Sequence, residues 1–117
     1  MTLPPPQQPH SHGAVLLADV QEREIVPGYR ARFVHGTNMT LAFWEIDAGA
    51  VLPEHSHPHE QASNLLRGEF ELTLSGECIQ LKPGMVVMIP PDAVHEGRAI
   101  TACQILDVFQ PVREDYR

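Results

Sequence analysis

Seven consecutive residues, HSHPHEQ at positions 55–61, concentrate side chains that bind transition metals. His55, His57, His59 and Gln61 stand at every second position, so all four side chains share one face if the segment is extended. The prolines in and before this segment favour extended backbone. Imidazole nitrogens bind Zn, Fe, Ni, Cu and Mn. The spacing therefore predicts up to four convergent metal donors.

A metal site needs a further ligand from elsewhere in the chain, and His95 is the candidate. It follows a proline-rich turn, where a new strand would begin. His35 stands in HGTN, a sequence typical of an exposed hairpin tip. His10 and His12 repeat the H-x-H pattern in a proline-rich tail, where we expect solvated side chains.

The C-terminal segment holds a second set of residues that could do chemistry. Alternation along ILDVFQ places Asp107 on the same face as Ile105 and Phe109, so a carboxylate lies on an apolar face. A buried lone carboxylate is costly unless it is paired or used. Two interpretations stay open: a structural ion pair with Arg113, or a general acid/base beside an arginine that holds a substrate carboxylate.

Short β-strands must position these side chains. Apolar runs recur from Ala14 onward and are separated by turn sequences. EFELTLSGE places Phe70, Leu72 and Leu74 on one face, and SGE is a tight turn into the partner strand CIQL. No helical periodicity of useful length appears. We predict an all-β sandwich or barrel.

One strand is apolar on both faces. In NMTLAFWEID, Met39, Leu41 and Phe43 share one face, whereas Trp44 and Ile46 share the other. A strand of this kind must be covered on both sides. A second subunit often supplies that cover in a small barrel, so we expect a homodimer.

The composition limits the classes of partner. The chain has 117 residues, and we predict one domain over residues 14–117 after a flexible, proline-rich arm at residues 1–13. The net charge of −7, with no basic cluster, argues against a nucleic-acid partner. No apolar run could span a membrane and no secretion signal is evident, so we expect a cytoplasmic protein. Cys78 and Cys103 are predicted to be buried and reduced.

Two spaced motifs resemble those of the cupin family. The first matches as a glycine, five residues, H-x-H, three residues, a ligand, six residues and a glycine, which are here Gly49, His55, His57, Gln61 and Gly68. The second matches as a glycine, five residues, a proline and a later histidine, which are here Gly84, Pro90 and His95. Asp92 stands where the family usually has glycine.

This resemblance implies a double-stranded β-helix, the cupin jelly-roll barrel. It also implies that one divalent transition metal, such as Zn, Ni, Fe or Mn, is held by His55, His57, Gln61 and His95. Gln61 departs from the commoner glutamate, and a neutral amide leaves the metal more positively charged. Glu60 has the opposite parity, and only a distorted strand would make it the ligand.

The segments HSHPHEQ and DVFQPVRED resemble one cupin subgroup, the small pectin- and alginate-degradation cupins that linearise unsaturated uronates. The resemblance implies that Asp107 moves protons, Arg113 engages the uronate carboxylate and Phe109 lines the pocket. His59 is either a substrate contact or an ordinary, partly exposed residue. ASNLLRG, which follows Gln61, departs from an aromatic-rich pocket wall.

We therefore expect a metal-dependent enzyme that isomerises or ring-opens an unsaturated sugar acid, with a small, anionic substrate. The alternatives are a metal-dependent dioxygenase and a non-catalytic module that binds or senses a sugar acid or a metal. A barrel whose histidines serve no metal also stays open.

Overall fold

The computed structural model describes residues 13–117 of the chain. The predicted arm therefore lies outside the described residues, except for Gly13, as do His10 and His12, and these expectations stay predictions. Within the described part, no helix is long and apolar enough to cross a membrane. The ten strands are β1 Arg23–Val26, β2 Tyr29–His35, β3 Thr40–Ile46, β4 Val51–His55, β5 Glu60–Arg67, β6 Phe70–Leu74, β7 Glu77–Leu81, β8 Val86–Ile89, β9 His95–Ala99 and β10 Cys103–Gln110.

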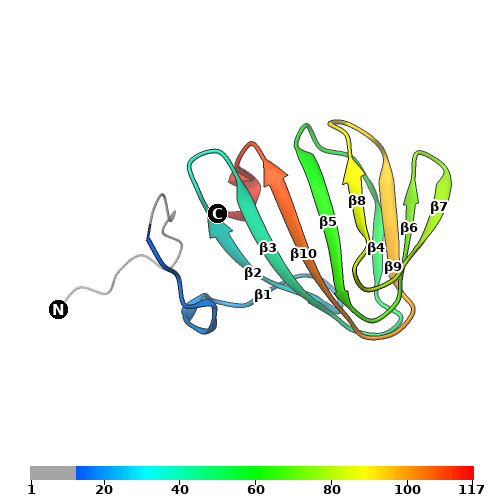
Figure 1. Ribbon diagram of the computed structural model, residues 1–117, viewed down its shortest axis with the longest axis horizontal. Coiled ribbons are helices and arrows are strands. Elements are labelled where there is room, and N and C mark those ends of the chain that lie inside the picture. Colours follow the sequence, from blue (N-terminus) through cyan, green and yellow to red (C-terminus); the bar gives the residue numbers. More distant parts are fainter. Residues whose placement is uncertain (1–12) are drawn as a thin grey trace.

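Two antiparallel sheets form the molecule, and the predicted all-β fold is confirmed. One sheet has the order β1-β2-β3-β10-β5-β8 and the other has the order β4-β9-β6-β7 (Figure 1). The helical segments of the described chain are two 3₁₀ turns, η1 at Leu17–Asp19 and η2 at Glu114–Tyr116. The second turn, drawn in red in Figure 1, returns the C-terminus to the ends of β2 and β3.

Alternation along the strands divides core from surface. On β3, Trp44 and Ile46 are buried, whereas Leu41 and Phe43 are half-buried on the outer face, as the sequence pattern predicts. The β6–β7 hairpin also forms in the predicted register. The prediction of a buried Cys78 is wrong: the residue is exposed, because Ile79 and Leu81 take the inward positions of the edge strand β7.

His35 does not lie at an exposed tip. The hairpin turn forms just beyond it, but the side chain is only 1% exposed, because β2 directs it inward and the C-terminal turn covers it. Its Nε2 donates to the carbonyl oxygen of Tyr116 (3.3 Å), and its Nδ1 accepts from Oγ1 of Thr40 (2.9 Å). Oγ1 of Thr40 accepts in turn from the amide of Arg113 (2.9 Å). This chain of bonds, which we call the His35 relay, anchors the C-terminal turn.

The motif glycines make turns that only a permissive backbone allows. Gly68 has a φ of +90°, and a Cβ there would collide with the carbonyl oxygen of Ala102. Asp92, in place of the usual glycine, also has a positive φ of 65°, which short polar residues tolerate. Its amide donates to the carbonyl oxygen of His57 at 2.8 Å, so the turn of the second motif holds the loop of the first.

Candidate metal and acid/base site

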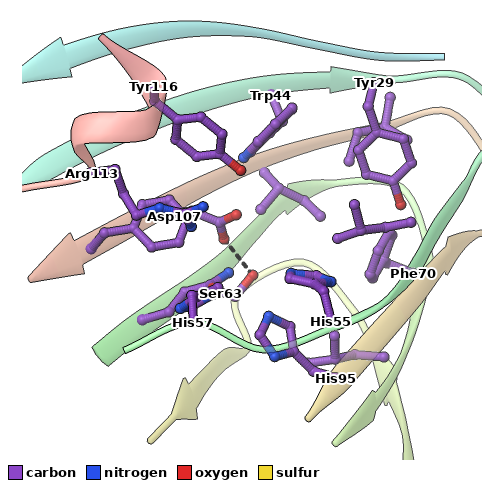
Figure 2. A pocket seen from close by; sticks show the side chains of 16 residues that line it. Tyr29, Trp44, His55, His57, Ser63, Phe70, His95, Asp107, Arg113 and Tyr116 are labelled. Atoms are coloured by element: carbon purple, nitrogen blue, oxygen red, sulfur yellow. Dashed lines mark hydrogen bonds between the residues drawn. The ribbon is translucent and has the colours of Figure 1, made fainter. Parts of the chain in front are cut away.

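Three histidines meet at one end of the four-stranded sheet. His55 ends β4 and His95 begins β9, and the two are direct partners in the register. His57 lies in the loop between β4 and β5, so the segment is not one continuous strand. The loop nevertheless brings His57 to the pair, and one ring nitrogen from each residue lies within 4.8 Å of the others (Figure 2).

Each ring of this triad is oriented by a backbone carbonyl. Nδ1 of His55 donates to the oxygen of Pro53 (2.8 Å), and Nδ1 of His95 donates to that of Ala93 (2.9 Å). Nδ1 of His57 donates to the oxygen of His59 at 3.1 Å. A carbonyl only accepts, so all three Nδ1 atoms carry hydrogen and all three Nε2 atoms keep a lone pair. This arrangement fixes the tautomer that a metal ligand requires.

Burial keeps two of these rings neutral. It lowers the pKa of His57 from 6.5 to about 4, and the positive charge of Arg113 contributes to the shift. Burial also lowers the pKa of His95. Desolvation disfavours the imidazolium form, so both rings stay available as ligands near neutral pH.

Gln61 adds an oxygen to the triad. Its Oε1 lies 3.0 Å from Nε2 of His57. With hydrogen on Nδ1, both facing atoms are acceptors, and their lone pairs would repel each other. A cation shared by the two atoms removes the conflict, and 3.0 Å suits neighbouring ligand atoms with metal bonds of about 2.1 Å. The donor set of His55, His57, His95 and Gln61 therefore fits a transition metal.

Glu60 and His59, which precede Gln61 in the sequence, lie apart from this donor set. Glu60 is exposed and lines a hollow on the outer face of the six-stranded sheet. The ring of His59 lies 5.6 Å from the ring of His57, and its Nδ1 is buried without a hydrogen-bond partner among residues 13–117.

A carboxylate shares the cavity with the triad. Asp107 lies in the middle of β10, opposite Ser63 of β5 and Ala42 of β3. These two small neighbours leave space above the carboxyl group. Oγ of Ser63 donates to Oδ1 of Asp107 at 2.6 Å (Figure 2). Burial raises the pKa of Asp107 to about 6, although nearby Ser63, Gln61 and Trp44 oppose the rise.

Arg113 reaches the same cavity, but its ion pair is with Asp115. Nε donates to Oδ1 at 2.9 Å and Nη2 donates to Oδ2 at 2.6 Å. The guanidinium lies 4.7 Å from the ring centroid of Phe109 and 4.1 Å from that of Tyr116. Among residues 13–117, no Asp107–Arg113 ion pair forms, so the structural interpretation of these two residues is wrong. The partner comes from the C-terminal turn.

The triad, Gln61, Asp107 and Arg113 line one hollow between the sheets. The volume open to the centres of water-sized molecules is about 40 Å³, and all empty space in the hollow, open solvent included, is about 470 Å³. Sequence reasoning missed several lining residues. Ser63 shares parity with Gln61 on β5 and could have been found in that way. No local pattern indicates the residues that fold in from elsewhere, which are Tyr29, Trp44, Phe70 and Tyr116.

Comparison with known proteins agrees with this geometry. The uncharacterized protein SCO3923 of Streptomyces coelicolor is 26% identical over 91 residues, which are 77% of this chain and 87% of that protein. The structure of KdgF from Halomonas sp. matches with a TM-score of 0.84 and 27% identity, over 91% of this chain and 100% of that one. An RmlC-like cupin from Shewanella frigidimarina matches with a TM-score of 0.79 and 26% identity, over 83% and 88% of the two chains.

The family model described as a cupin domain matches residues 42–109, which hold the triad, Gln61 and Asp107. The predicted jelly-roll architecture and the resemblance to a small single-domain cupin are confirmed. The chain belongs to the cupin family.

Proposed function

We propose that this cupin is a metal-dependent enzyme that ring-opens or isomerises an unsaturated sugar acid. The observation that carries the proposal is the meeting, in one cavity, of a neutral metal-binding donor set and a buried carboxyl group with a pKa near 6. The donor set would hold a metal that binds substrate oxygens, and the carboxyl group would accept and donate protons. Structural similarity to KdgF, together with the segments that resemble uronate-linearising cupins, directs the choice of substrate.

His55, His57, Gln61 and His95 would hold one divalent transition metal, such as Zn, Ni, Fe or Mn. When bound, such an ion polarises the oxygens of a substrate as a Lewis acid. Gln61 has a second task, because its amide also stabilises the nearby Asp107 carboxylate. The amide nitrogen faces a group that only accepts, which leaves Oε1 directed toward His57.

Asp107 would act as the general acid/base. Opening the hemiacetal of an unsaturated uronate removes a proton from the anomeric hydroxyl and breaks the bond to the ring oxygen. The resulting enol becomes a ketone when its carbon is protonated, so no atoms are gained or lost. A carboxyl group with a pKa of about 6 can accept and return a proton near neutral pH. The hydrogen bond from Ser63 orients it.

Arg113 would bind the carboxylate of the substrate through Nη1, because Asp115 occupies Nε and Nη2. Phe109 would pack against the sugar ring, since it lies beside both Arg113 and His57. His59, next to His57, would contribute a further polar contact through its unpartnered Nδ1.

The test mixes the metal-loaded protein with unsaturated galacturonate and follows the loss of the enol-ether absorbance. The wild type should accelerate the loss, and Asp107→Asn should lower kcat by about 100-fold or more while the metal content stays the same. Asn keeps the shape and the acceptor for Ser63, so it is a conservative change.

No acceleration over buffer with added metal would overturn the proposal, and so would full activity of Asp107→Asn. Binding of the uronate without turnover would move the assignment to a sugar-acid sensor. Oxygen consumption with a phenolic substrate would move it to a dioxygenase.

We further propose that the protein is a homodimer, joined through the outer face of the six-stranded sheet. Leu66, Val86 and Met88 are exposed there, at 51%, 55% and 55%, and Leu66 shares a shallow hollow with the half-buried Phe43. A twofold pairing would bring this apolar surface against its own copy. Light scattering should give twice the chain mass, and Met88→Glu should shift it toward the monomer. A monomeric wild type would contradict this proposal. The cytoplasmic location stays a prediction.

A further inference from the structure

Apolar side chains form part of the cavity wall. Phe70, Leu72 and Ile105 line it, at 5%, 5% and 4% exposure. The hydroxyl group of Tyr29 is directed toward Phe70 in this region (Figure 2). In this view the Tyr29 hydroxyl lies across the hollow from the Asp107 carboxyl group and from Arg113. The hollow thus has two polar regions with apolar walls between them.

Tyr29 Oη is buried and has no hydrogen-bond partner among residues 13–117. The residue is only 2% exposed. A buried donor without a partner costs about 1–3 kcal/mol, so such groups usually have a functional or structural reason. The hydroxyl also stays protonated at neutral pH, because burial raises the pKa of Tyr29 further above its ordinary value. It is therefore a fixed, neutral donor.

Trp44 packs beside Tyr29 and already serves Asp107. Its Nε1 is buried, and the indole helps to lower the pKa of the Asp107 carboxyl group, so its donor is directed at that carboxylate. The ring meets Tyr29 edge to face at a centroid distance of 5.8 Å, so each ring holds the other in place. The indole nitrogen is directed toward the Asp107 side of the hollow, whereas the Tyr29 hydroxyl is directed toward Phe70 (Figure 2).

We propose that Tyr29, held in place by Trp44, forms a distal subsite that binds an oxygen of the substrate at the end away from its carboxylate. The site then selects molecules with oxygen at both ends and an apolar ring face between them, a description that fits a six-carbon sugar acid. A three-carbon hydroxy acid would engage Arg113 without reaching Tyr29. This inference rests on the proposed function for its choice of ligand.

The test compares wild type and Tyr29→Phe, both metal-loaded, with two probes that are not turned over. Galacturonate carries oxygens at both ends of a six-carbon chain, and glycerate is the short control. Tyr29→Phe should weaken galacturonate binding by about 3- to 10-fold, the loss of one hydrogen bond, and leave glycerate binding unchanged. Calorimetry measures both dissociation constants. Thr73→Val is the matched control, since it removes a hydroxyl from the outer face of β6.

Thermal melting of the ligand-free proteins supplies the second readout. Removing an unpartnered buried hydroxyl should leave the Tm equal or higher. A Tm for Tyr29→Phe well below that of Thr73→Val would show that the fold already pairs this hydroxyl, which overturns the inference. Equal galacturonate binding by wild type and Tyr29→Phe, or no galacturonate binding by the wild type, also overturns it.

The uronate assay separates this inference from the proposed reaction. Galacturonate binding that depends on Tyr29, without turnover of unsaturated galacturonate, would disprove the proposed reaction and support the subsite. Turnover with an unchanged KM in Tyr29→Phe would support the proposed reaction and disprove the subsite.

Discussion

The two halves of the cavity are built in different ways. In the metal half, each histidine ring bonds to a carbonyl two residues away, and His55 and His95 are neighbours in one sheet. In the acid/base half, the bonds join distant parts of the chain: Ser63 to Asp107, and Thr40 to Arg113. In the first half the ring orientations are set locally, although the pairing of β4 with β9 brings His95 to His55. In the second half the bonds themselves form only when β5, β10 and the C-terminal turn have assembled.

This difference indicates which perturbations each half can absorb. Loss of a ligand should remove the metal and leave the fold intact, because the oriented rings sit at strand ends. Loosening of the C-terminal turn should disturb Arg113 and spare the metal. Gln61 is the connection between the halves, since its amide faces both His57 and Asp107. Variants that change residues in only one half test whether the two halves respond independently.

The largest effect is expected in the metal half. His57→Ala removes the ligand that faces Gln61, and it should lower metal affinity by at least about 100-fold. Competition with a chelator and elemental analysis measure this. His59→Ala is the control, because its backbone carbonyl still orients His57. Full metal retention in His57→Ala would contradict the assigned donor set.

A smaller effect is expected where Arg113 is held. Asp115→Asn removes half of a charge-assisted bidentate pair, so the guanidinium should lose its orientation and KM should rise about 5- to 10-fold with kcat nearly unchanged. Steady-state kinetics on the uronate measure the split. Glu114→Gln, which affects an exposed pair with Arg117, should change neither constant. A fall in KM for Asp115→Asn would instead mean that Asp115 competes with the substrate.

The smallest effect concerns pH and the His35 relay. Burial lowers the pKa of His35 below 6.5, so the unfolded chain binds more protons as the pH falls through that value. The contribution of neutral His35 to the free energy of unfolding is therefore fully present above pH 6.5. It decreases below pH 6.5 by at most about 1.4 kcal/mol for each pH unit. Protonation would also place a hydrogen on Nδ1, where Thr40 now donates.

Chemical denaturation of the metal-free protein at pH 7.5 and 5.5 checks this expectation. The wild type should lose more stability between the two values than His35→Gln, which cannot titrate there. An identical loss in both proteins would show that His35 is not the group responsible.

Strand parity was enough to predict much of the fold and part of the site. It placed Gln61, Asp107 and Phe109 on inward faces, because a period of two holds wherever backbone is extended. It failed for His57, which lies in a loop, although the spacing of the two motifs still identified the residue. The ion pair of Arg113 with Asp115 could not be predicted, since nothing local distinguishes that carboxylate from Glu114. The buried His35 depends on a segment 81 residues further along the chain.

The carbonyl bonds of the triad have a consequence for sequence divergence. Their acceptors belong to the backbone of Pro53, His59 and Ala93, so no side-chain replacement at these positions deletes an acceptor atom. Most side-chain substitutions near the triad should therefore leave the orientation of the three imidazole rings unchanged. Residues around the donor set are then free to change the ligand that the barrel accepts while its capacity to hold a metal is inherited.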